Sequence, residues 1–119
     1  MNRAGILKEA LLRATHACLW AEEQAIWHTD LEHARARRQS QARVERVLTQ
    51  AAHEDLIGPT DQRRLLGVVM DALVQVRWRH EARHMHNAAT FPVIEASLEK
   101  DVRQAWSQCV RNHWWRRAA

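Results

Sequence analysis

The sequence predicts an all-α protein, an antiparallel bundle of four helices. The chain of 119 residues contains only three glycines and two prolines, and neither residue type occurs between positions 6 and 57. Apolar residues recur at helical spacing in every segment between these helix-breaking residues. A content of 46% hydrophobic and 27% charged residues is typical of a folded chain. We therefore expect a single helical domain over residues 1–119, long enough to bury one core.

Local signals place the ends of the helices. Thr29 followed by Glu32 matches a capping box, so one helix should end just before it and another begin there. The Gly-Pro-Thr-Asp segment at 58–61 is the clearest turn, with Thr60 as the expected N-cap, and Pro92 suits the first turn of a last helix. Short connections between helices of similar length predict antiparallel neighbours, although one rod running through Thr29 is an alternative. The expected helices are 3–27, 30–55, 60–87 and 92–117.

Each expected helix carries an apolar stripe, and the four stripes predict the core. Two cysteines fall on these stripes without a CxxC pair, which favours buried, reduced thiols over redox chemistry. The predicted core residues are Leu7, Leu11, Ala14, Cys18, Ala21 and Ala25, then Val44, Val47, Leu48 and Ala51, then Leu65, Leu66, Val69, Ala72, Leu73 and Val76, and finally Ile94, Leu98, Val102, Ala105, Cys109 and Val110.

The first helix is apolar over much more than the ~100° arc that a peripheral bundle helix needs. Only two lines of residues along the surface of this helix are consistently polar, and they end at Glu22 and Glu23. Either this helix lies at the centre of the fold, or a partner covers the edge that carries Trp20 and Trp27. Because Trp is a favoured interface anchor, we expect a protein interface. Its predicted residues are Trp20, Trp27, Trp114 and Trp115.

The charge of the chain points to an anionic partner. Of the 18 basic residues 16 are arginine, the net charge is +4 and the pI is near 10. The guanidinium group is always charged, and its planar fork fits phosphate, whereas a GC-rich genome would enrich arginine without functional meaning. The candidate nucleic-acid-binding residues are Arg35, Arg37, Arg38, Arg43, Arg46, Arg77, Trp78, Arg79, Arg83, Arg116 and Arg117.

In an antiparallel bundle the start of the second helix and the end of the third lie together. Arg35, Arg37 and Arg38 should therefore approach Arg77 and its neighbours, where they could contact a nucleic-acid backbone without reading bases. The alternative is a solvated face on which Glu32 and nearby acids pair with the arginines. The tryptophans beside arginines suit either base stacking or protein contact.

Motifs for catalysis and for cofactor binding are lacking. The chain has no Gly-rich phosphate loop, nucleophile elbow or HExxH motif, so we expect no enzyme activity and no cofactor. His80 and His84 share a helix face, but a metal site needs three or four ligands, and we predict no metal there. No apolar run reaches the ~18 residues of a membrane span, and charges interrupt the N-terminus. We therefore expect a cytoplasmic protein without a membrane partner.

With arginine faces at 35–46 and 77–83 on a short, basic, all-helical chain, the sequence resembles the small subunits of CRISPR effector complexes. Such subunits line a nucleic-acid path and pack against one another. The resemblance implies a non-enzymatic assembly subunit in antiviral defence that contacts single-stranded RNA or DNA and other protein subunits, and it is compatible with self-association. The alternative is a phage- or plasmid-encoded inhibitor or adaptor that binds a host protein through its Trp and Arg surfaces.

Overall fold

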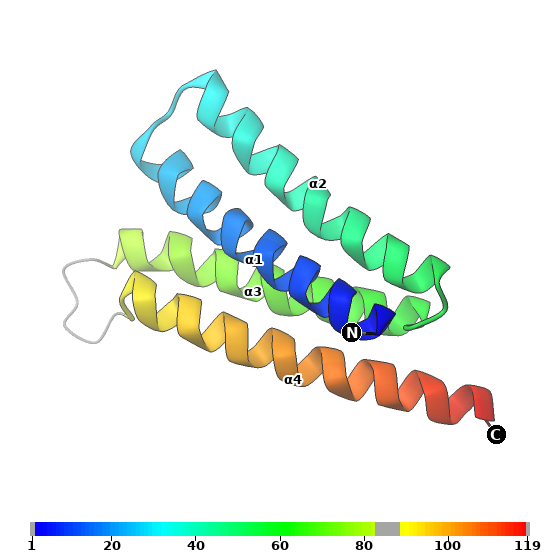
Figure 1. Ribbon diagram of the computed structural model, residues 1–119. Helices are drawn as coiled ribbons and strands as arrows, with labels where there is room; N and C mark the ends of the chain where they lie inside the picture. The colour runs from blue at the N-terminus through cyan, green and yellow to red at the C-terminus, as the bar shows by residue number, and fades with distance from the viewer. Residues whose placement is uncertain (1, 83–88, 119) are drawn as a thin grey trace.

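A computed structural model describes residues 2–82 and 89–118. It confirms the predicted all-α bundle, since 89% of the described residues are helical and none of them lies in a strand. Consecutive helices run antiparallel, so the two termini lie at the same end of the molecule (Figure 1). The helices are α1 (Arg3–Trp27), α2 (Leu31–His53), α3 (Pro59–Glu81) and α4 (Phe91–Ala118).

The helical conformation is interrupted between α1 and α2, which excludes the alternative of one continuous helix through Thr29. The end of α1 at Trp27 is as predicted, but the capping box of Thr29 and Glu32 is wrong. Asp30 is the N-cap, with extended backbone angles and a carboxylate that accepts a hydrogen bond from the His33 backbone N–H over 2.9 Å. The cap therefore falls one residue later, because the Asp30 side chain already satisfies an N–H of the first turn.

The turn at 54–58 connects α2 to α3. Asp55 has a φ of 62°, a left-handed conformation that Asp tolerates, and the N–H of Leu56 bonds the Ala51 carbonyl over 3.0 Å. These features close a Schellman-type end, so α2 ends at His53 rather than at the predicted residue 55.

The expectation that Thr60 caps α3 is wrong. Gly58 is the N-cap, and Asp61 accepts a hydrogen bond from its backbone N–H over 2.8 Å. Pro59 takes the first helical position because its fixed φ suits a helix and its missing N–H would have no partner there. The helix ends at Glu81, and residues 83–87 of its predicted span lie outside the described residues. Pro92 lies in the first turn of α4, as predicted.

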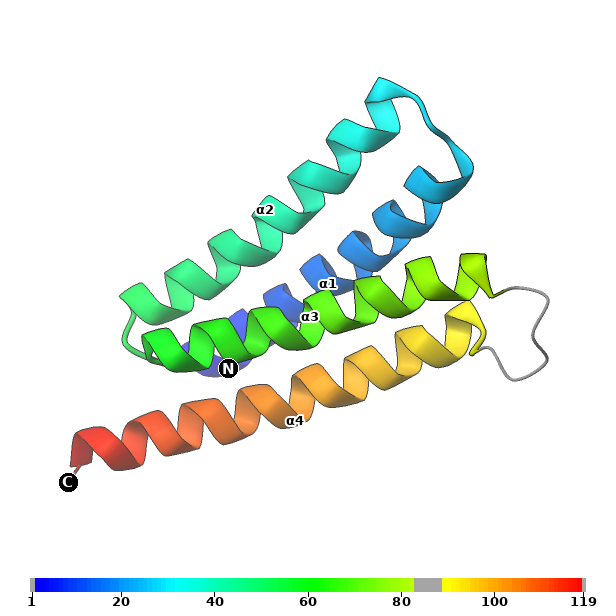
Figure 2. The same cartoon turned by 180° about the vertical axis from the view of Figure 1, so that it is seen from behind.

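The core has contributions from all four helices and follows the predicted stripes closely. α1 packs on each of the other three helices, whereas α2 and α4 lie on opposite sides of the bundle (Figures 1 and 2). Trp106 joins the core and is 2% exposed. The predicted core residues that stay only partly buried are Ala21, Ala25, Val47, Leu66 and Val110.

The central position of α1 accounts for its wide apolar surface. However, the face of α1 that is exposed to solvent does not carry its polar residues. Thr15, Glu22 and Glu23 are buried, while Trp20 and Trp27 are 50% and 58% exposed. Hence α1 is central in the fold and also presents an aromatic edge to solvent. None of the described helices is both long enough and apolar enough to cross a membrane.

Candidate nucleic-acid interface

The candidate arginines fall into three sets, two of which lie at opposite ends of the bundle. Arg37, Arg77 and Arg79 lie where α1 and α3 end, whereas Arg116 and Arg117 end α4, which runs antiparallel to α3. A helix of 23 residues such as α3 is about 35 Å long. The predicted residues therefore do not form one local site.

At the first end, two arginines converge on a buried carboxylate of α1. Glu22 is 0% exposed, and its Oε1 accepts a hydrogen bond from Arg77 Nη1 over 3.0 Å. Arg37 Nε lies 3.9 Å from Glu22 Oε2, which has no hydrogen-bond partner among the described residues. Arg37 of α2 and Arg77 of α3 thus meet at this end through α1, but both face an internal charge, and the first turns of α2 diverge from α3 (Figures 1 and 2).

Glu23 organises the neighbouring contacts. Its carboxylate accepts hydrogen bonds from Arg79 Nη1 over 3.1 Å and from Trp27 Nε1 over 3.3 Å, and His80 Nε2 lies 3.1 Å away. Burial is the largest influence on the pKa of Glu23 and raises it. The hydrogen bonds from His80 and Trp27 and the charge of Arg79 together outweigh burial, so the pKa lies below its usual value. Glu23 is therefore a carboxylate at neutral pH.

Glu22 and Glu23 were missed as arginine partners in the sequence. Pairs with Glu32 or Glu81 do not occur among the described residues. One available signal was position along the chain. α1 and α3 run parallel, so charges shortly before the end of each helix meet at the same end of the bundle.

At the opposite end, basic residues of α4 fasten the helix to the first turn of α3 and to the turn before it. Arg116 Nη2 lies 2.8 Å from the buried Asp61, and Arg117 Nε lies 2.9 Å from Asp55. His113 also bonds Asp55 over 2.8 Å, and this hydrogen bond is the main reason that the pKa of Asp55 is lowered. Arg116 and Arg117 thus have structural partners.

A third set of arginines lies along the outer side of α2, and we call it the α2 arginine face. All four are exposed, and none of them forms an ion pair with any residue in the described part of the chain. α2 contains five arginines against two glutamates, so it carries +3 of the net charge of +4. From first to last the face spans about 17 Å at 1.5 Å per residue. It consists of Arg35, Arg38, Arg43 and Arg46.

The exposed tryptophans lie on helices other than α2. Trp78 is 48% exposed and continues an apolar stripe of α3 through Met70 and Val74. Trp114 and Trp115 are each 60% exposed, with ring centroids 5.3 Å apart.

No protein-family model, curated protein or solved structure matches this chain.

The cysteines and histidines offer little for catalysis. Cys18 and Cys109 are free and buried, and burial raises the pKa of both thiols, which keeps them protonated. This agrees with packing rather than redox chemistry. Arg83 and His84 lie outside the described residues, so the pairing of His80 with His84 rests on positions that the structure does not describe.

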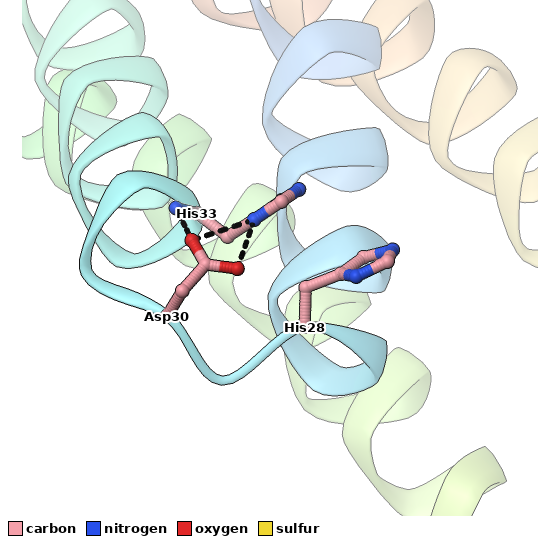
Figure 3. A group of neighbouring side chains, drawn as sticks. All are labelled: His28, Asp30 and His33. Atoms are coloured by element: carbon pink, nitrogen blue, oxygen red, sulfur yellow. Dashed lines mark hydrogen bonds and ion pairs between the residues drawn. The ribbon is translucent and has the colours of Figure 1, made fainter.

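Three side chains at the junction of α1 and α2 do form a group of possible metal ligands. His28, Asp30 and His33 place one ligand atom each within 4.8 Å of one another (Figure 3). The sequence analysis did not identify this group. The H-x-D-x-x-H spacing becomes a cluster only because the chain turns between the two helices, and the spacing alone does not specify the geometry of that turn.

Proposed function

We propose that this protein is a non-enzymatic helical subunit of a nucleoprotein assembly and that its α2 arginine face contacts a nucleic-acid backbone without sequence specificity. The observation that carries this proposal is the division of the arginines. Arg37, Arg77 and Arg79 neutralise buried carboxylates of α1, and Arg116 and Arg117 hold α4 to a turn. The α2 arginine face has no such partner in the described part of the chain.

The chemistry of this face suits phosphate. Each guanidinium presents a planar fork of donors that matches two phosphate oxygens. The face spans about 17 Å, about five phosphates of one strand at 3.4 Å per nucleotide along the axis. Contacts of this kind position a strand but do not read its sequence.

The role of an assembly subunit rests on the tryptophans. Trp20 and Trp27 leave about half of their surface exposed on α1, and Trp114 and Trp115 do so at the end of α4. Exposed Trp side chains are favoured anchors of protein interfaces. The resemblance to small CRISPR effector subunits, which combine a basic path with protein packing, supports the same role, with RNA or single-stranded DNA as the strand. The reduced, buried thiols support a cytoplasmic location.

Fluorescence anisotropy with labelled single-stranded RNA and DNA tests the proposal. Changing all four residues of the α2 arginine face to Gln should weaken binding about 100-fold, because four exposed ion pairs of up to about 1 kcal/mol each are lost. The matched control removes four exposed charges elsewhere, through Arg13→Gln, Arg63→Gln, Lys100→Gln and Arg111→Gln. The control should bind like the wild type. Equal weakening of binding in both variants would mean that binding depends only on the net charge of the protein, and this would contradict a local site.

The second candidate is an inhibitor or adaptor that binds a host protein, and the exposed pair Trp114 and Trp115 favours it. Affinity purification from the native host, with and without nuclease, separates the two functions. Partners that are lost on nuclease treatment support the nucleoprotein subunit. Partners that remain attached, and that are lost when both tryptophans are changed to Ala, support the inhibitor or adaptor.

A further inference from the structure

We propose that His28, Asp30 and His33 form a binding site for one divalent ion of the zinc, nickel or cobalt class. The proposal rests on side chains outside the α2 arginine face and does not depend on the proposed function. His28 caps the end of α1, Asp30 caps the start of α2, and His33 lies in the first turn of α2. The break between the two helices therefore brings together three ligands that a continuous helix would separate.

The three side chains lie close to one another, with one ligand atom of each within 4.8 Å of the others. His33 Nδ1 lies 2.8 Å from both carboxylate oxygens of Asp30. Two ligands with bonds of about 2.0–2.1 Å to a tetrahedral ion lie about 3.3 Å apart. The imidazole of His28 stacks on that of His33, with centroids 4.4 Å apart and planes 17° apart. Stacked rings direct their nitrogens side by side, so binding requires the side chains to rotate until the three ligand atoms, which lie within 4.8 Å of one another, converge on the ion.

The N-cap hydrogen bond leaves room for an ion. Asp30 Oδ1 accepts the bond from the His33 backbone N–H, while Oδ2 receives no backbone hydrogen bond among the described residues. Its partner is the side chain of His33, whose Nδ1 lies 2.8 Å away, so an ion that replaces the shared proton could bind Oδ2 and Nδ1 while the cap persists. His28 and Asp30 are exposed and His33 is partly exposed, so an ion can enter from solvent and water can complete its coordination.

The donor set selects the class of ion. Two imidazoles and one carboxylate suit zinc, nickel and cobalt, whereas magnesium and calcium prefer oxygen ligands alone. With three protein ligands the ion keeps at least one water. By linking the end of α1 to the first turn of α2, it would fix the angle between these helices at the end where the α2 arginine face begins.

Isothermal titration calorimetry of the untagged, chelator-treated full chain with zinc tests this site. We expect one zinc ion per chain and no binding of magnesium. Asp30→Asn should weaken zinc binding at least about tenfold. This change keeps the cap because Asn caps helices as well as Asp does, so circular dichroism should be unchanged. His28→Gln combined with His33→Gln should abolish the stoichiometric binding.

The matched control is His53→Gln, an exposed histidine at the other end of α2, which should bind zinc like the wild type. NMR of the imidazole rings should show zinc-dependent shifts at His28 and His33. The site would be refuted if the wild type binds no zinc. Equal zinc binding by the wild type and the double His variant would also refute it, since the ion would then occupy other histidines.

Discussion

Two adjacent buried carboxylates, those of Glu22 and Glu23, form ion pairs with three of the arginines. An ionised carboxylate inside a protein is costly unless it is paired and hydrogen-bonded, and Glu22 is 0% exposed. Arg77 and Arg37 reach it from α3 and α2, so these cations stabilise the junction of three helices. A basic residue in this sequence is therefore not evidence of a ligand until its internal partners are known.

Replacing Arg77 by Met should destabilise the fold. The substitution keeps most of the aliphatic stem but leaves the buried carboxylate of Glu22 without its 3.0 Å partner, and we expect the free energy of unfolding to fall by about 3 kcal/mol. Urea denaturation at pH 7 measures this change. The control Arg35→Met, on the exposed side of α2, should alter stability by no more than about 0.5 kcal/mol. Equal effects of the two substitutions would contradict the structural role of Arg77.

Acid should weaken the contact between the start of α1 and the end of α2. Hydrogen bonds from Arg3, at 2.7 and 2.6 Å, and then from Gln50 lower the pKa of Glu54 to about 2. This pKa is lower in the folded chain than in the unfolded chain. The stabilisation of the fold by ionised Glu54 is therefore complete above about pH 4.5 and is lost as the pH falls toward 2.

Urea midpoints at pH 7 and pH 3 test this dependence. The wild type should lose more stability on acidification than Glu54→Gln, which has no carboxylate to protonate at this position. A variant as sensitive to acid as the wild type would show that Glu54 makes no such contribution.

At the scale of the helix, periodicity predicted nearly all of the packing. The stripes of α3 and α4 lie in the core, and most helix ends fall within two residues of their predicted positions. The errors concern caps, because several polar residues compete there. Asp30 rather than Thr29 is the N-cap of α2, and Gly58 rather than Thr60 is the N-cap of α3. Individual hydrogen bonds decide both positions, and the order of residue types does not reveal them.

The stripe of α3 gives a test within one helix. Leu73 is 0% exposed, whereas its neighbour Val74 is 52% exposed. Leu73→Ala should lower the free energy of unfolding by about 2–5 kcal/mol through the cavity that it leaves. Val74→Ala, as the control, should have a much smaller effect in the same denaturation experiment. Similar losses for both variants would mean that the face of α3 is assigned wrongly.

α2 differs from the other helices in that its two halves have different roles. Its buried residues Val44, Leu48 and Ala51 all lie in the second half. In both views the helix diverges from α3 toward its N-terminal end (Figures 1 and 2). The sequence predicted this division, since its first half offers little to bury. It could not predict which arginines remain unpaired, because that depends on carboxylates of α1 far away in the sequence.

For the molecule as a whole, α1 has two roles that the sequence presented as alternatives. It occupies the centre of the bundle, yet Trp20 and Trp27 use only part of their surface inside it. Trp20 packs on Phe91 with centroids 4.7 Å apart, and Trp27 on His80 at 4.8 Å. The outer surfaces of both rings stay exposed on one edge, where a second protein chain can cover them.

Light scattering tests whether copies of this chain cover that edge. We expect the wild type to self-associate and Trp20→Glu combined with Trp27→Glu to be a folded monomer, because two charges on the edge oppose burial. Circular dichroism verifies that the variant is folded. A wild type that is monomeric, with a double variant that unfolds, would place both side chains in the core and contradict the interface.

The most direct test of the central claim is the salt dependence of binding to single-stranded nucleic acid. Neutralising four phosphates on a single strand predicts that log K falls against log[salt] with a slope of about −3. Changing the α2 arginine face to Gln should remove most of this slope, whereas the control that removes Arg13, Arg63, Lys100 and Arg111 should retain it. A slope near zero for the wild type, or the same slope for both variants, would contradict a phosphate-binding face on α2.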